Sequence, residues 1–323
     1  MALPRVLVTR RLPDAVEQHI GAHFDATFNP DDTPLRRDQL AQAMRDYDAL
    51  CPTITDRLGA DILGTPDARV RIIANFGAGV DHVDLAAARA AGITVTNTPD
   101  VLTDATAELA ITLMLMAARR AGEGERVLRA GAWGGWGPTD LIGQSIVGKT
   151  LGLVGFGRIA QTTAERARAG FGMKIAYYSR RRAPEGIEAR LGARYVPSLA
   201  ALAAEADILS LHTPGGDDTR HLVDAALLAR MKPSAILVNT ARGTVVDEAA
   251  LAEALAARRI AAAGLDVYEK EPQVHPALLA LENAVLLPHL GSATIETRVA
   301  MGMRAAANLE AWFNEEEPRD RVV

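Results

Sequence analysis

One segment near the middle of the chain combines a buried strand, a glycine-rich turn and a helix. Residues 150–154 read TLGLV, a short apolar run with the pattern of a buried strand. Gly155, Gly157 and Ala160 follow as G-x-G-x-x-A, residues 159–169 have helical spacing without proline, and a second apolar run comes after them. The first glycine permits a tight turn, the second lets the backbone approach a pyrophosphate, and the small third residue allows the helix to pack on the strand. The segment therefore predicts a dinucleotide-binding domain with the phosphates at the helix N-terminus.

The second strand of this β-α-β unit ends in a basic run. An acidic residue usually stands about 20 residues after the glycine motif and hydrogen-bonds the ribose hydroxyls of NAD. Here Ser179, Arg180, Arg181 and Arg182 occupy this place. A carboxylate would repel a 2′-phosphate, whereas a guanidinium binds phosphate through paired, charge-assisted hydrogen bonds. The alternative is a solvated basic turn. We expect NADP(H) as the preferred cofactor, with NAD(H) as the second candidate.

Length and composition narrow the class of protein. The chain has 323 residues, 49% of them hydrophobic, and a net charge of −5, so we expect two domains and no nucleic-acid partner. The single cysteine, Cys51, excludes an intramolecular disulfide and a multi-cysteine metal site, and we expect no metal. Residues 1–10 lack the apolar core of a signal peptide, and no apolar span reaches 18 residues. We therefore expect a cytoplasmic protein without a membrane partner.

The first hundred residues alternate strand and helix patterns, which predicts a parallel sheet covered on both faces. Residues 54–56 are expected to begin one of these helices, with Thr55 or Asp56 as its cap. No G-x-G-x-x-G follows the first strand, so this part is not expected to bind the dinucleotide. The expected strands are 5–8, 48–51 and 70–75, and the other expected helices are 14–23 and 39–47.

Strand patterns continue after the β-α-β unit, at 207–211, 235–238, 261–265 and 284–287. They predict a six- or seven-stranded doubly wound sheet. The amphipathic helix pattern at 295–313 has no strand after it, so we expect it to return to the first domain. The predicted fold class is α/β, with two doubly wound parallel-sheet (Rossmann-like) domains and a cleft between them. Residues 1–99 and 290–323 form a discontinuous, flavodoxin-like substrate-binding domain, and residues 100–289 form the NAD(P)-binding domain.

A long helix pattern at 103–120 includes the run ITLMLMAA at 111–118, which is apolar nearly all round. This pattern favours burial on both sides, in a helix that crosses between domains or packs against a second subunit. We therefore expect a homodimer. The glycine-rich segment 131–138 follows and carries Trp133 and Trp136, which either contact a ligand or partner or pack within the chain.

Several side chains that can do chemistry stand directly after predicted strands, namely His212, Arg242, Asp266, Glu271 and His289. Reduction of a 2-oxo acid needs a cation for the carboxylate, a proton donor for the developing alkoxide, and a hydride. Arg242 suits the first task because its planar fork matches a carboxylate, and His289 suits the second because histidine exchanges protons near neutral pH. Glu271 would orient the imidazole. The other histidines are interpreted as buried structural imidazoles: His19, His23, His82, His221 and His275.

Six motifs in order along the chain resemble those of the D-isomer-specific 2-hydroxyacid dehydrogenases, and within that family the glyoxylate/hydroxypyruvate reductases. The two departures are Ala160 in place of the third glycine, which the fingerprint tolerates, and the missing ribose carboxylate; neither threatens the assignment. The motifs are NFGAGVDHVD (75–84), TPDVLTDATAELA (98–110), LVGFGRIA (153–160), NTARGTVVDEAAL (239–251), AAAGLDVYEKEP (261–272) and LLPHLGSAT (286–294).

The resemblance implies a role for each matching residue. Arg242, Glu271 and His289 would be catalytic, with His289 as the proton donor, and Asp266 would contact the nicotinamide carboxamide. The implied substrate-binding set is Ile54, Gly77, Ala78, Gly79, Arg242 and His289. The implied cofactor-binding set is Thr106, Gly155, Phe156, Gly157, Arg158, Ile159, Ser179, Arg180, Arg181, His212, Thr213, Pro214, Thr219, Thr240, Ala241, Asp266, Gly291 and Ser292.

Together these features predict an NADPH-dependent reductase that converts glyoxylate to glycolate and hydroxypyruvate to D-glycerate. An NAD-linked D-lactate dehydrogenase, or another D-2-hydroxyacid dehydrogenase, is the alternative within the family. A cofactor-sensing scaffold resembling the C-terminal-binding-protein corepressors is the alternative from another class.

Overall fold

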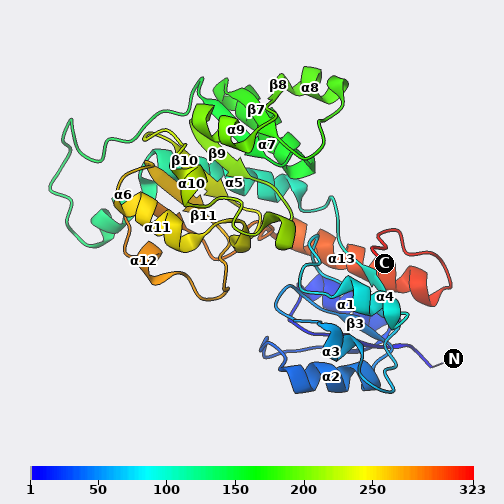
Figure 1. The fold of residues 1–323 in the computed structure, drawn as a ribbon. Coiled ribbons are helices and arrows are strands. Elements are labelled where there is room, and N and C mark those ends of the chain that lie inside the picture. The colour runs from blue at the N-terminus through cyan, green and yellow to red at the C-terminus, as the bar shows by residue number, and fades with distance from the viewer. Residues whose placement is uncertain (1) are drawn as a thin grey trace. The chain divides into compact units, whose positions relative to one another are not determined.

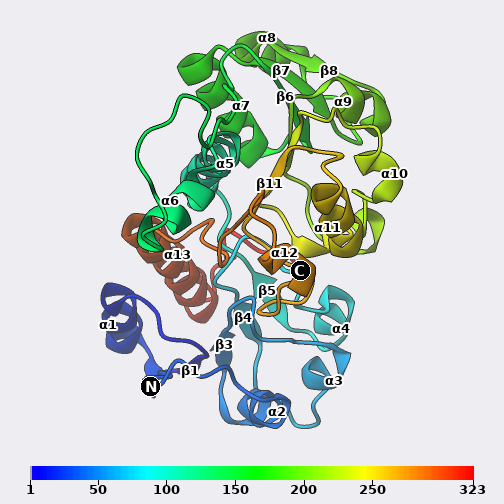
Figure 2. The same cartoon turned by 90° about the vertical axis from the view of Figure 1, so that its left-hand side faces the viewer.

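Two parallel sheets of different width organise the computed structural model, which describes residues 2–323 (Figures 1 and 2). The chain divides into two compact units. The N-terminal unit combines the residues up to Leu102 with Ser292–Val323, and the C-terminal unit is Thr103–Gly291. No helix in the described residues is both long enough and apolar enough to cross a membrane. The predicted fold class, α/β with two Rossmann-like parallel sheets, is confirmed.

The N-terminal unit is a five-stranded parallel sheet between two layers of helices. Its strands, in order across the sheet, are β2 (Asp25–Thr27), β1 (Arg5–Val8), β3 (Ala49–Cys51), β4 (Ile72–Ala74) and β5 (Thr94–Thr96). Successive residues of a strand point to opposite faces, so Val6 and Val8 join one hydrophobic core and Leu7 joins the other. α1 (Asp14–His23) and α13 (Ile295–Phe313) cover the first core, and α13 lies beside α1 (Figure 2). The other core is covered by α2 (Arg37–Asp46), α3 (Ala60–Leu63) and α4 (Leu85–Ala90).

The helix expected to begin at residues 54–56 is absent, and this expectation is wrong. These residues form a turn, and α3 begins only at Ala60. Asp56 is buried and accepts hydrogen bonds from Thr9 Oγ1 at 2.6 Å and from the Thr53 N–H at 2.8 Å. Its carboxylate therefore ties the loop after β3 to the end of β1 instead of capping a helix.

The C-terminal unit is a seven-stranded parallel sheet that also has a hydrophobic core on each face. One core involves the helices α5, α7 and α8, and the other involves α9, α10, α11 and α12. The strands, in order across the sheet, are β12 (Ala284–Leu286), β11 (Ala262–Leu265), β10 (Ile236–Asn239), β9 (Ile208–Leu211), β6 (Thr150–Val154), β7 (Lys174–Tyr178) and β8 (Ala193–Tyr195). The helices are α5 (Thr103–Ala118), α6 (Ala121–Arg129), α7 (Arg158–Phe171), α8 (Glu185–Leu191), α9 (Leu199–Glu205), α10 (Ala225–Leu228), α11 (Glu248–Ala256) and α12 (Pro276–Leu279), with short 3-10 turns η1 (Asp217–Thr219) and η2 (Gly243–Val245).

α5 is the long apolar helix expected from the sequence. It packs on α7 and on strands β10 and β11, and Gly264 of β11 gives Leu113 room to approach. Leu113 and Met114 are fully buried, whereas Ile111, Leu115 and Met116 remain partly exposed. The helix therefore has one fully buried face and one apolar face that is only partly covered within the chain.

A buried ion pair holds the residues after α13 on the N-terminal unit. Arg304 donates two hydrogen bonds to Asp320, at 2.6 and 2.7 Å, and Asn308 donates a third at 3.1 Å. The side chains of Asp320 and Arg304 are only 5% and 18% exposed. Burial tends to raise the pKa of Asp320, but the hydrogen bonds from Arg304 and Asn308 outweigh it and lower this pKa below the usual value. Asp320 is therefore charged at neutral pH.

We expect Asp320→Asn to lower the free energy of unfolding at pH 7 by about 3 kcal/mol, because it leaves the largely buried Arg304 guanidinium without its counter-charge. A carboxyl whose folded-state pKa is lowered stabilises fully above its unfolded-state pKa, near 4, and this contribution is lost as the pH falls through the folded-state pKa. Urea denaturation of both proteins from pH 7 down to pH 3.5 should show the difference shrinking below about pH 4.

Glu317→Gln is the matched control for this ion pair. It removes the neighbouring pair with Arg321, whose side chains are 69% and 47% exposed, and it should change stability by less than about 1 kcal/mol. Equal losses of unfolding free energy in Asp320→Asn and Glu317→Gln would contradict a larger contribution of the buried pair to stability.

Candidate active site

The glycine-rich turn after β6 is shaped by close backbone packing. Gly155 has a φ of +85°, and a Cβ on it would lie 2.6 Å from the carbonyl oxygen of His212, so only glycine fits. Gly157, at the N-cap of α7, has ordinary backbone angles, and a Cβ there would meet nothing within 4 Å. No side chain in the described residues caps this helix terminus. The turn thus offers an open backbone and a helix N-terminus, the features that fit a pyrophosphate.

His212 lies at the end of β9, directly against this turn. Its Nε2 is 2.9 Å from Ser210 Oγ, and burial lowers the pKa of the imidazole to about 4. The ring is therefore neutral at physiological pH. Beyond it, Thr219 Oγ1 donates to the carbonyl oxygen of Pro214 at 2.8 Å and closes the following loop. His212 is thus an uncharged side chain beside the turn at Gly155.

The three arginines that follow β7 differ in their partners and therefore in their availability to a ligand. Arg182 donates to both carboxylate oxygens of Glu188, at 2.9 and 2.7 Å, and Tyr177 donates to the same carboxylate. These hydrogen bonds lower the pKa of Glu188 to about 2, so Arg182 is part of a charged structural pair. Arg180 and Arg181 are exposed, and Arg180 meets the exposed carboxylate of Asp218 at 3.2 Å. Of the three arginines, Arg180 and Arg181 are therefore the two whose guanidinium groups can contact a ligand.

Four of the residues predicted to do chemistry come together at the carboxyl ends of β10, β11 and β12, namely Arg242, Asp266, Glu271 and His289. His289 Nδ1 lies 2.9 Å from Glu271 Oε2, and Glu271 Oε1 accepts from the Tyr268 N–H at 3.0 Å. Because a carboxylate only accepts, Nδ1 of His289 carries the proton that is donated to Glu271. The His289 and Glu271 side chains are 31% and 32% exposed. The pair therefore presents Nε2 of His289 as the ring nitrogen that can reach a ligand.

Glu271 remains charged in this setting. Burial raises its pKa, but the hydrogen bond and charge of His289, the Tyr268 N–H and the Arg242 guanidinium together bring it below the usual value. The influence of Arg242 on this carboxyl shows that the two side chains share one electrostatic environment.

Asp266 fixes the loop that carries His289. It is 1% exposed, and its two carboxylate oxygens accept from the N–H groups of Leu290 at 2.6 Å and Gly291 at 2.8 Å. The Asp266 carbonyl accepts from the His289 N–H at 2.9 Å, and Thr106 Oγ1 donates to the Gly291 carbonyl at 3.1 Å. Burial raises the pKa of Asp266 to about 6, against the lowering effect of these backbone hydrogen bonds and of His289. Both carboxylate oxygens of Asp266 thus hold the loop that carries His289.

Arg242 is placed by the residues on either side of it. Asn239 donates to the Arg242 carbonyl at 2.8 Å and accepts from the Ala241 N–H at 3.0 Å, which closes the turn after β10. A Cβ on Gly243 would overlap the backbone of Tyr268 and Glu269. This close approach brings the loop of Arg242 onto the loop that leads to Glu271. Arg242 itself is half-buried, and one of its terminal nitrogens donates to the Ala241 carbonyl at 2.7 Å.

The remaining predicted substrate residues lie in the N-terminal unit. Ile54 is 36% exposed, and the loop of Gly77, Ala78 and Gly79 follows β4. Two side chains that were not expected from the sequence order this loop. Asn75 donates to the carbonyls of Gly77 and Gly79, at 3.0 and 2.9 Å, and Asn97 donates to the Ala78 carbonyl at 2.7 Å. The available signal was asparagine at a strand end, since Asn75 follows β4 as Asn239 ends β10.

The other histidines only partly match the expectation of buried imidazoles. His82 is 8% exposed and bonds Asn75 Oδ1 at 2.9 Å, as expected. His23 is exposed, and the His19 and His221 side chains are each 35% exposed, so the expectation is wrong for these three. His221 pairs with Glu269 at 3.0 Å. His275 is half-buried.

The fold and this geometry define a dinucleotide-binding α/β protein with a histidine–carboxylate pair at the carboxyl edge of its larger sheet. Residues 111–291 match the sequence model of the D-isomer specific 2-hydroxyacid dehydrogenase NAD binding domain. The chain belongs to the D-isomer specific 2-hydroxyacid dehydrogenase family. The family predicted from the six motifs is thereby confirmed, and the cofactor is a nicotinamide dinucleotide.

Relatives of similar length support this assignment. The chain is 43% identical over 319 residues to a glyoxylate reductase of Thermococcus onnurineus, covering 98% of this chain and 94% of the relative. It is 46% identical over 329 residues to a glyoxylate reductase of Aeropyrum pernix, covering 100% and 96%. The crystal structure of an NADPH-dependent glyoxylate/hydroxypyruvate reductase from Sinorhizobium meliloti, in complex with NADP and malonate, matches with a TM-score of 0.86 and 38% identity, covering 100% of this chain and 97% of that one.

Proposed function

We propose that the protein reduces glyoxylate to glycolate and hydroxypyruvate to D-glycerate, with NADPH as the reductant. The observation that carries this proposal is the 2.9 Å pair of His289 and Glu271, with Arg242 in the same electrostatic environment, in a unit that also has the dinucleotide turn. The names of the relatives, glyoxylate reductase and NADPH-dependent glyoxylate/hydroxypyruvate reductase, support the substrate and the cofactor.

Each of the three residues has one task in this proposal. Arg242 binds the substrate carboxylate through its planar guanidinium. His289 donates the proton on Nε2 to the carbonyl oxygen that becomes the hydroxyl group. Glu271 accepts from Nδ1, which fixes the ring and stabilises its protonated form before the transfer. When bound, the reduced nicotinamide supplies the hydride.

The chain's own residues also fit the cofactor. The open turn at Gly155 and Gly157 and the N-terminus of α7 would hold the pyrophosphate. Arg180 and Arg181 would hold the 2′-phosphate, with Arg180 leaving its exposed partner Asp218, and residues 179–182 after β7 include no carboxylate that would repel that group. Thr106, Thr240, Ala241, Asp266 and Gly291 remain proposed contacts toward the nicotinamide end.

A steady-state assay of the purified protein with glyoxylate, hydroxypyruvate and pyruvate, each with NADPH and with NADH, tests the function. We expect a higher kcat/KM with NADPH, and with glyoxylate or hydroxypyruvate as substrate. A preference for pyruvate and NADH would overturn the proposed substrate and cofactor while leaving the family unaffected. Absence of turnover in a protein that still binds NADPH would favour a cofactor-sensing scaffold.

Cofactor preference makes a separate prediction. We expect replacement of both Arg180 and Arg181 by serine to raise the KM for NADPH by about tenfold or more, because charge-assisted hydrogen bonds to the 2′-phosphate are lost. The KM for NADH, which lacks that phosphate, should change little. Arg194→Ser, which removes an exposed arginine of β8 that pairs with Glu205, is the matched control. The prediction fails if the ratio of the two KM values is the same in the double variant and the wild type.

We also propose a homodimer. α5 keeps Ile111, Leu115 and Met116 partly exposed, and the segment after α6 exposes Trp133 by 58%, Trp136 by 84%, Ile142 by 62% and Val147 by 66%. Large exposed apolar side chains gathered in one stretch of chain are typical of a protein–protein interface. Light scattering after size exclusion should give twice the mass of the chain, 34.3 kDa. A monomer at micromolar concentration would contradict the proposal.

A further inference from the structure

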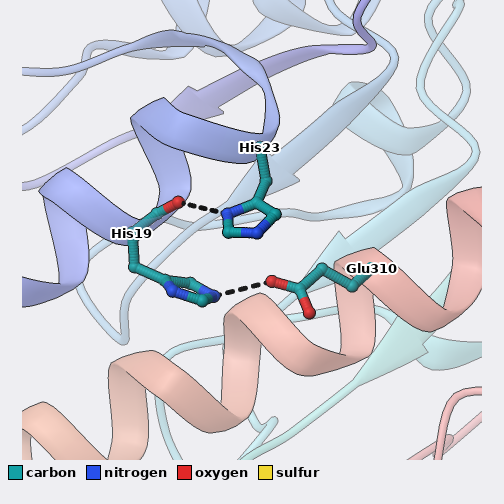
Figure 3. A group of neighbouring side chains, drawn as sticks. All are labelled: His19, His23 and Glu310. Carbon is teal, nitrogen blue, oxygen red and sulfur yellow. Dashed lines mark hydrogen bonds and ion pairs between the residues drawn. The ribbon is translucent and has the colours of Figure 1, made fainter.

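Two histidines and a glutamate meet on the N-terminal unit, outside the residues of the proposed function (Figure 3). His19 and His23 are one turn apart on α1, and Glu310 is on α13. Their ligand atoms all lie within 4.8 Å of one another, and the two imidazole rings are 4.5 Å apart between centroids. Residues four apart on a helix project from the same face, so α1 alone presents both imidazoles to α13.

The hydrogen bond of His23 leaves its other ring nitrogen available to a metal ion. His23 Nδ1 is 2.8 Å from the backbone carbonyl of His19, and because a carbonyl only accepts, Nδ1 carries the proton. In the neutral ring, Nε2 is then the nitrogen with the lone pair, and Figure 3 shows it on the side where His19 and Glu310 meet. A metal-bound histidine commonly donates its other N–H to a carbonyl in this way.

His19 Nε2 is 2.7 Å from Glu310 Oε1. Two ligands of a tetrahedral zinc ion, each about 2.0–2.1 Å from the metal, are separated by about 3.3 Å. An ion that replaces the shared proton therefore needs His19 and Glu310 to part by a few tenths of an ångström, and the third ligand to move in from within 4.8 Å. Rotation of partly exposed side chains supplies such movements without a change of backbone.

The backbones that carry the three ligands are firmly placed. On α13, a Cβ at Gly302 would lie 2.5 Å from two carbons of Val16 on α1, so the glycine lets the two helices pack closely. Phe24, which follows α1, contacts the ring of Phe313 at the end of α13, with centroids 5.8 Å apart. These contacts bracket the cluster, so the spacing of α1 and α13 is fixed before any ion arrives.

We propose that His19, His23 and Glu310 form a binding site for a divalent transition metal ion of the zinc class. Two imidazoles and one carboxylate suit Zn²⁺ better than Mg²⁺ or Ca²⁺, which prefer oxygen ligands alone. Water completes the coordination, since His23 is exposed. The bound ion ties α1 to α13, which are 291 residues apart at the His19–Glu310 contact, and stabilises the N-terminal unit.

Calorimetric titration of EDTA-treated, full-length protein with Zn²⁺ tests the site. We expect one ion per chain and a melting temperature that rises by several degrees with saturating Zn²⁺ and returns after EDTA. His23→Gln should weaken binding at least about tenfold, as loss of a ligand does, and its exposed position makes it harmless to folding. Glu310→Gln keeps an acceptor for His19 but loses the charge, and it should also weaken binding.

His221→Asn is the matched control, because it removes the histidine of another histidine–glutamate pair, one without a second histidine. It should leave Zn²⁺ binding unchanged. The proposal is overturned if the wild type binds no Zn²⁺, or if His23→Gln and Glu310→Gln bind it as tightly as the wild type, since the ion would then lie elsewhere.

Discussion

His289→Asn is expected to lower kcat by about 10²–10⁴-fold, because it removes the proposed proton donor to the carbonyl oxygen. Asparagine is chosen because His289 has a φ of +55°, a left-handed conformation that asparagine adopts more readily than alanine. The dissociation constant for NADPH, measured by fluorescence titration, should stay close to that of the wild type. The two measurements together separate loss of chemistry from loss of the cofactor site.

His221→Asn is the control for this experiment. His221 also pairs with a glutamate, at 3.0 Å, and also has a left-handed backbone, with a φ of +49°. It has no proposed role in the reaction, so its replacement should leave kcat within a factor of about two. Comparable turnover in His289→Asn and the wild type would refute the proposed role of His289.

Gly243→Ala is expected to have the largest effect on stability. A Cβ at this position would overlap the carbonyl carbon of Tyr268 and the amide nitrogen of Glu269, and backbone atoms cannot swing aside as a side chain can. We expect a loss of at least about 4 kcal/mol in the free energy of unfolding, or failure to fold. Any folded protein should have poor turnover, because this contact sets the Arg242 loop against the loop of Glu271.

Gly170→Ala is the matched substitution for this comparison. Gly170 lies near the end of α7, is exposed, and would place its Cβ within 4 Å of nothing. Alanine should therefore stabilise the helix, by up to about 1 kcal/mol. Chemical denaturation of the two variants checks whether the free energy of unfolding falls in Gly243→Ala and rises in Gly170→Ala. Equal stability of Gly243→Ala and the wild type would show that the Arg242 loop and the Glu271 loop can separate freely.

Long helices could be predicted from the sequence because their apolar periodicity repeats over several turns, and two strands could be predicted from short apolar runs. The expected helices at 14–23 and 295–313 and the strands at 5–8 and 150–154 have the bounds of α1, α13, β1 and β6. Short elements contain too few residues to show a hydrophobic period, so β2, α4 and β8 were not expected. The helix expected at 54–56 was wrong because a capping side chain, Asp56, has a long-range partner in Thr9.

The candidate site was predicted in part for a similar reason. Parallel strands end at one edge of a sheet, so Arg242, Asp266 and His289 could be expected to meet, and the structure brings them together with Glu271. The positioning roles of Asn75 and Asn97 were missed because their backbone partners can be identified only in the folded chain, and asparagine at a strand end was the one signal in the sequence. The proposed metal site of His19, His23 and Glu310 was missed because Glu310 lies 291 residues from His19 in the sequence, and only the tertiary structure brings them together.

The discontinuity of the N-terminal unit affects the order in which the protein folds on the ribosome. α13 contributes Met301, Ala305 and Leu309 to one of the two cores of this unit, yet these residues are synthesised after the whole of the C-terminal unit. Until α13 emerges, Val16 and Ile20 lack the part of this core that α13 supplies, and the nascent chain exposes an apolar surface of the kind that chaperones bind. The C-terminal unit is continuous, so it can complete its folding first although its translation starts second.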